Sequence, residues 1–138
     1  MESILTLAVQ PLQEFIASQT IANDHLGIYL CTNTSGKMES VAFWKESLIK
    51  TPSFVNPAIF PWTLPNAAAA RLAYLLQVTG PVYTFLGTSD QHQVPLKTAY
   101  MDWKKKQIQF ALLVELEVEE TILNLNLRVI HPEAIIVE

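Results

Sequence analysis

Along this chain, apolar residues recur every three or four positions in some stretches and every second position in others. The clearest helical stripe lies in the alanine-rich stretch 66–76, which stands between Pro65 and the pair Gly80-Pro81. Proline favours the first turn of a helix and glycine followed by proline favours its end, so these residues predict the helix boundaries. The apolar members of the stripe are Ala69, Leu72, Ala73 and Leu76. The same spacing predicts further helices over residues 12–19, 38–49 and 95–103.

Other segments have the pattern of strands. The short apolar runs Leu26–Cys31 (LGIYLC) and Val82–Leu86 (VYTFL) predict buried strands. In Val114–Glu119 and Leu123–Val129, apolar residues alternate with polar ones, which predicts a hairpin with one buried face and a turn at Glu120-Thr121. Helices that alternate with apolar runs of this kind are typical of an α/β protein.

The segment Asn56–Leu64 is expected to be extended or turning. Its prolines recur every four residues, and each one removes a hydrogen-bond donor and clashes with a preceding helical turn. Phe60 and Trp62 are expected to anchor the segment by burial. The remaining apolar segments are residues 4–9, which fit a strand or the first turns of a helix, and residues 134–137, which fit a short strand.

Composition bounds the class of protein. A chain of 138 residues is expected to form one domain, residues 1–138. Half of its residues are hydrophobic and only 16% are charged, which predicts a large buried interface in addition to a core. The net charge of −4 argues against a nucleic-acid partner. One cysteine, no long apolar run and an N-terminus without basic residues predict a cytoplasmic protein with no membrane span and no signal peptide.

One stretch resembles a known family. From Pro57 to Ala69 the chain reads P-x-x-F-P-x-T-x-P-N-A-x-A, and Gly80-Pro81 then opens a strand. The residues that carry the resemblance are Pro57, Phe60, Pro61, Thr63, Pro65, Asn66, Ala67 and Ala69. This pattern is similar to the N-terminal half of the β-ketoacyl synthases, the condensing enzymes of fatty-acid and polyketide assembly, and it extends more weakly over residues 26–118. The resemblance implies half of a thiolase-like fold: a mixed sheet with flanking helices, followed here by C-terminal amphipathic strands.

The resemblance also bears on catalysis. In the family the strand after the Gly-Pro pair ends at a nucleophilic cysteine, and this chain has Ser89 there. The family's catalytic histidines come from a second half of the fold, and the chain is expected to end before that half begins. The resemblance therefore implies a truncated, noncatalytic form, similar to the chain-length-factor subunits that pair with active ketosynthases. From Leu112 onward the glutamate-rich strand departs from the glycine-rich pattern of the family.

An enzymatic alternative uses Ser89 with Asp90 and His92 as a serine acyl hydrolase or transferase. Residues of one short loop seldom converge as a catalytic triad, so a catalytic role is not expected. Cys31 is expected to be a small buried apolar residue. The histidines are scattered singly, so neither a metal nor another cofactor is expected. The glutamates of Glu115–Glu119 are expected to form a solvated sheet face.

Assembly remains as the predicted role. Condensing enzymes of this kind pair through the strand that here reads Val82–Leu86, and an unpaired apolar edge would promote aggregation. The first hypothesis is a noncatalytic ketosynthase-like subunit that pairs with an active ketosynthase or with itself in fatty-acid or polyketide biosynthesis, with acyl carrier protein as an indirect partner. The second is a self-paired dimer that binds a small apolar or acyl ligand. The expected interface residues are Phe60, Trp62, Asn66, Val82, Tyr83, Thr84, Phe85 and Leu86.

Overall fold

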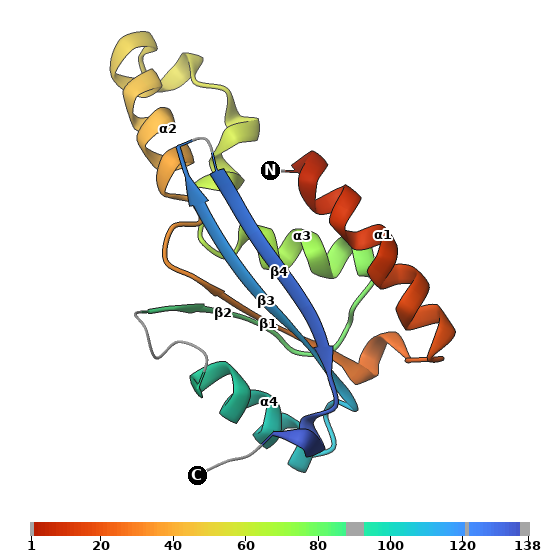
Figure 1. Ribbon diagram of the computed structural model, residues 1–138. Coiled ribbons are helices and arrows are strands. Elements are labelled where there is room, and N and C mark those ends of the chain that lie inside the picture. Colours follow the sequence, from red (N-terminus) through yellow and green to blue (C-terminus); the bar gives the residue numbers. More distant parts are fainter. Residues whose placement is uncertain (1, 88–92, 121, 136–138) are drawn as a thin grey trace.

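The computed structural model describes residues 2–87, 93–120 and 122–135, and it has an α/β fold (Figure 1). Its four-stranded sheet has the order β2-β1-β3-β4. The strands are β1 (Leu26–Thr32), β2 (Val82–Leu86), β3 (Phe110–Glu119) and β4 (Ile122–Ile130). The helices are α1 (Glu2–Ser18), α2 (Lys37–Lys50), α3 (Ala67–Leu76) and α4 (Gln93–Lys104). The predicted mixed sheet with flanking helices and C-terminal amphipathic strands is confirmed.

The sheet is mixed because its two halves pair differently. The central strand β1 is parallel to β2, with Ile28 opposite Val82, and parallel to β3 on its other side. Strand β3 is antiparallel to β4, with Leu116 opposite Leu125. The predicted hairpin is therefore confirmed, although Thr121 of its turn lies outside the described residues. Strand β3 begins at Phe110, earlier than predicted, because its first half is buried on both faces and shows no alternation.

Helices cover both faces of the sheet, as Figure 1 shows, and each face has its own core. On one face, α1 and α3 bury leucines and isoleucines of β1 and β3, including Ile28, Leu30 and Leu112. On the other face, α4 covers Tyr29 and Leu113. Burial of apolar side chains on both faces explains why β1 and the start of β3 read as continuous apolar runs.

Strand β2 differs from its prediction. The run Val82–Leu86 was expected to be buried, but all five of its residues are partly or fully exposed. The reason is its place in the sheet, since β2 is the terminal strand and has a hydrogen-bonded neighbour on the β1 side only. Gly80 precedes it where the chain passes so close to the carbonyl of Leu26 that a Cβ atom would clash with it. The left-handed residue that ends α3 is Gln77, not Gly80 as predicted.

The proline-rich segment, which was expected to be extended or turning, forms a run of 3₁₀ turns, η3 (Pro57–Thr63). In a 3₁₀ helix, backbone hydrogen bonds join residues three apart instead of four. Proline is tolerated at the first position of such a helix. Asn56 caps it by accepting a hydrogen bond from the Ala58 amide at 3.0 Å. Phe60 is 53% exposed, so its expected burial is wrong, and its ring lies beside Phe43 of α2. Trp62 is partly buried against the core, as expected.

The segments near both ends of the chain also differ from what the sequence predicted. Residues 4–9 and 12–19 belong largely to the one helix α1, which runs through Pro11, so the strand alternative for the first of them is wrong. Ala134 lies in a short 3₁₀ turn (Pro132–Ala134) where a strand was expected. Residues 136 and 137 of that expected strand lie outside the described part of the chain.

A buried hydrogen bond joins α4 to the central strand. The Tyr29 hydroxyl donates to Oδ2 of Asp102 at 2.7 Å, and both side chains are buried. Burial first, and then the bond to Asp102 and its charge, raise the pKa of Tyr29 above that of an ordinary tyrosine. The hydroxyl therefore keeps its proton and remains a donor, which satisfies a polar group that is buried under α4.

Replacing Tyr29 with phenylalanine tests this bond. The Tyr29→Phe variant removes one hydrogen bond to the buried Asp102 carboxyl group, so we expect the free energy of unfolding to fall by about 1–3 kcal/mol. Tyr100→Phe on α4, where the ring rests beside Trp103, is the control, with an expected change within about 0.5 kcal/mol. Urea denaturation followed by circular dichroism measures both. Equal losses in the two variants would contradict the role of the bond.

Candidate functional site

The exposed edge of the sheet is the most prominent candidate site. Strand β2 pairs with β1 on one side, and among the described residues no strand pairs with its other side. Apart from the hydroxyl groups of Tyr83 and Thr84, the side chains along this edge are apolar, and Val82 and Leu86 are exposed to solvent, Leu86 to 62%. An open edge of this kind is a template for pairing with another strand. Natural proteins usually protect such an edge with charges, and VYTFL contains none.

Three aromatic rings extend from the core to this edge. Tyr83 of β2 stacks on Tyr29 of β1 with ring centroids 5.5 Å apart, and Phe85 stacks on Tyr83 at 5.8 Å. Partial burial first, and then the charge of Asp102 and a hydrogen bond to it, raise the pKa of Tyr83. The stack orients the rings of Tyr83 and Phe85, because Tyr29 is itself bonded to Asp102. The edge is therefore a rigid, neutral surface.

The predicted interface residues fall into two groups. Val82, Tyr83, Thr84, Phe85 and Leu86 form the edge strand β2. Phe60 and Trp62 belong to η3 and Asn66 directly precedes α3. Trp62 and Asn66 line a hollow between η3 and α3, and no residue of β2 lines it. The five predicted residues of β2 thus lie together on one edge, whereas Trp62 and Asn66 line a separate hollow.

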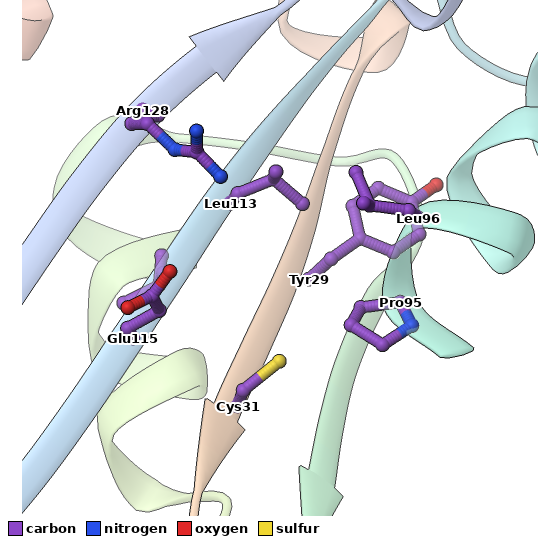
Figure 2. Close-up of a pocket in the computed structure, with 8 residues that line it drawn as sticks. Tyr29, Cys31, Pro95, Leu96, Leu113, Glu115 and Arg128 are labelled. Carbon is purple, nitrogen blue, oxygen red and sulfur yellow. The ribbon is translucent and has the colours of Figure 1, made fainter. Parts of the chain in front are cut away.

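The predicted nucleophile position cannot be placed, because Ser89, Asp90 and His92 lie outside the described residues. The only thiol of the chain is Cys31 of β1, which is 3% exposed. Figure 2 shows its sulfur on the side of β1 where Tyr29 and Pro95 lie. The hollow beside it holds only about 10 Å³, close to the minimum for a single water molecule.

The electrostatic surroundings also disfavour a thiolate. Burial first, and then the charges of Glu115 and Glu117, raise the pKa of Cys31 to about 11. Reactive cysteines have lowered pKa values, because the thiolate is the nucleophile. Cys31 is therefore a buried apolar residue, as the sequence predicted. Within the described part of the chain, no three histidine, cysteine or acidic side chains form a group that could hold a metal ion.

Glu117 has a role that the sequence analysis missed. It was expected on a solvated face, but its carboxylate is partly buried and accepts hydrogen bonds from the Asn33 amide at 2.9 Å and the Thr34 hydroxyl at 2.6 Å. The Thr34 hydroxyl in turn accepts from the Val118 amide. These bonds tie the loop after β1 to β3. The partners are 83 and 84 residues apart, so no local pattern could reveal them.

Comparisons with known proteins identify the fold and no closer relationship. No protein-family model matches the sequence, and no curated protein matches it significantly. Among solved structures, the chain is similar to the ishigamide ketosynthase/chain length factor, with a TM-score of 0.64 and 20% sequence identity. The match covers 70% of this chain and 27% of that one, so the chain spans about a quarter of that protein's length. The similarity shows a ketosynthase-like, half thiolase-like fold.

No helix in the described ranges is long and apolar enough to cross a membrane.

Alkylation of Cys31 tests its burial and its raised pKa. At pH 8 a thiol with a pKa of about 11 is roughly 0.1% ionised, against roughly a quarter for an ordinary cysteine. We expect iodoacetamide to modify the folded protein about 100-fold more slowly than the chain in urea, as measured by mass spectrometry. The folded state holds the Cys31 proton more tightly than the unfolded chain does. The raised pKa therefore contributes to the free energy of unfolding below about pH 9, and this contribution is lost as the pH rises towards 11. Equal alkylation rates would contradict this assignment.

Proposed function

We propose that this protein is a noncatalytic ketosynthase-like subunit that pairs through β2 with an active ketosynthase in polyketide-type or fatty-acid-type biosynthesis. The observation that carries the proposal is the open, uncharged edge of β2 on a ketosynthase-like fold. A similar solved structure is described as a ketosynthase/chain length factor, which names a pair of this kind. As a partner of cytoplasmic synthases, the subunit acts in the cytoplasm, and a carrier protein reaches it only through the ketosynthase.

Pairing through β2 is supported by the physics of the edge. An antiparallel strand placed against β2 would satisfy its outward-facing backbone groups and cover Val82 and Leu86. The stacked rings of Tyr83 and Phe85 would add a rigid apolar surface. Such a surface loses little side-chain entropy on binding, because its rings are already ordered.

The noncatalytic role is supported by the state of the only thiol. A condensing reaction needs a thiolate that accepts an acyl chain. Cys31 is buried, and its pKa is raised to about 11. By the resemblance, the position of the family's nucleophile holds Ser89, and a serine is a much weaker nucleophile than a cysteine unless a base activates it. The proposed contribution of the chain is therefore to stabilise its partner and to shape the space that the partner's acyl chain occupies.

A self-paired dimer is the second candidate, because the same edge can pair with its own copy in an isologous interface. The two candidates differ in one observable. A subunit for a ketosynthase forms a mixed complex on co-expression, whereas a self-sufficient dimer keeps its own mass in the presence of the ketosynthase.

Leu86→Asp tests the pairing edge. Leu86 is preferable to Tyr83 as a target because Tyr83 stacks on the buried Tyr29, and a change there would damage the core. We expect the aspartate to abolish the complex, since pairing would bury an unpaired charge. Light scattering after size-exclusion chromatography measures the mass, alone and after co-expression with a ketosynthase.

The matched control is Leu7→Asp on α1, because Leu7 is also a highly exposed leucine, at 72%. This variant should keep the wild-type mass, and circular dichroism should show that both variants are folded. If Leu86→Asp keeps the wild-type complex while it is folded, β2 is not the interface.

Ser89→Ala separates the proposed subunit from a serine acyl hydrolase or transferase. We expect the variant to keep full product formation in a reconstituted synthase and to leave hydrolysis of p-nitrophenyl butyrate at the level of the buffer. Ser18→Ala, on the exposed end of α1, is the control. A large loss of product or of ester hydrolysis in Ser89→Ala, but not in Ser18→Ala, would make the serine catalytic.

A further inference from the structure

A buried carboxylate lies under the helix that covers one face of the sheet, close to the exposed edge. Asp102 of α4 is 5% exposed and is the only buried charged side chain in the described ranges. It accepts the hydrogen bond from the Tyr29 hydroxyl at 2.7 Å. Burial of an ionised group costs free energy, and an apolar side chain would hold a helix on a sheet without that cost. Packing of α4 alone therefore does not explain the carboxylate.

The Tyr29 ring fits closely between β1 and α4, where Figure 2 shows it beside Leu96. It lies over Gly27, and a Cβ atom added to that glycine would come within 2.7 Å of the ring and 2.8 Å of its hydroxyl oxygen. Glycine thus leaves the space that the ring needs, and the bond to Asp102 fixes the hydroxyl end. Gly27 and Asp102 together restrict the ring from two sides.

Tyr29 is the support for the exposed rings of β2. In the parallel register it lies opposite Tyr83, and the two rings stack with their centroids 5.5 Å apart and their planes 22° apart. Phe85 then stacks on Tyr83 at 5.8 Å. Tyr83 is 37% exposed, so the stack begins in the core and ends at the surface. A shift of the Tyr29 ring would therefore change the surface that is proposed for pairing.

Asp102 also acts on Tyr83 directly. Partial burial first, and then the charge of Asp102 and a hydrogen bond to it, raise the pKa of Tyr83. The same carboxylate therefore favours the protonated hydroxyl of both tyrosines. Two phenols that face one acceptor are oriented relative to each other, which the packing of apolar rings alone does not specify.

We propose that Asp102 is a positioning residue for the β2 edge, which acts through Tyr29 and fixes the orientation of Tyr83. The inference rests on the proposed pairing through β2, and it gives α4 a part in that pairing although α4 lies outside the edge. Rings that are already ordered lose little entropy when a partner strand binds. Without Asp102 the strand stays in the sheet, but its rings are no longer held for the partner.

A double variant separates positioning from simple stabilisation. Tyr29→Phe combined with Asp102→Leu removes both polar partners and keeps the shape of each side chain, so the melting temperature should stay close to the wild-type value. The dissociation constant for pairing should nevertheless rise about tenfold, because the exposed rings are less ordered. Sedimentation equilibrium measures the constant, with the chain alone and with the purified ketosynthase. Tyr100→Phe is the control and should leave it unchanged.

Fluorine NMR reports the orientation of Tyr83 without any partner. The chain is labelled with 3-fluorotyrosine in the Leu86→Asp background, and Tyr83 is assigned by its replacement with phenylalanine. Its resonance should differ from that of the free amino acid, because the rings of Tyr29 and Phe85 lie beside it. The double variant should move the resonance towards the free value, whereas Tyr100→Phe should not. A residue that only anchors α4 would leave the resonance unchanged.

Failure of this inference and failure of the proposed function give different results. If the wild-type chain pairs, and the folded double variant pairs as tightly or keeps the Tyr83 resonance, Asp102 is not a positioning residue. If the wild-type chain pairs with neither its own copy nor the ketosynthase, the proposed function is wrong, and a response of the resonance to the double variant still supports the positioning of Tyr83. Should the double variant not fold, Tyr29→Phe alone, measured where it is fully folded, gives the same test.

Discussion

The structure depends on one constraint: β1 lies in the middle of the sheet with all seven of its residues buried. It is paired in parallel on both sides, so its backbone groups are satisfied by β2 and β3. Its side chains alternate between the two cores, with Ile28 under α3 and Tyr29 under α4. Every helix that covers the sheet packs against this strand or against strands that it holds in place, and the bond between Tyr29 and Asp102 joins α4 to it.

The two ends of the sheet have opposite character. Strand β4 ends one side with leucines facing the core and Asn124, Asn126 and Arg128 between them, a pattern that water can solvate. Strand β2 ends the other side with an uncharged, partly exposed aromatic surface. Both terminal strands have an unpaired backbone edge among the described residues, but the fully exposed positions of β4 are mostly polar and those of β2 are mostly apolar. This asymmetry is the physical basis for the proposal that the chain pairs through β2.

The candidate sites of the molecule differ in what their surroundings permit. Around Cys31, burial and two nearby glutamates oppose negative charge, so a thiolate nucleophile is disfavoured. The hollow between η3 and α3 has mostly apolar walls, which include Trp62 and Tyr74. Burial and the local charges around Cys31 therefore keep its thiol protonated.

The sequence alone determined the α/β class, the central strand, the C-terminal hairpin and most of the helices, because each depends on local periodicity. Through the motif around Asn66, it also indicated the ketosynthase-like fold that the structural comparison supports. Only the tertiary structure decided that β2 is an exposed edge, that Glu117 ties the loop after β1, and that Arg71 shares a hollow with Trp62. Those features depend on which segments become neighbours, and neighbours in space are set by long-range pairing that no local pattern records.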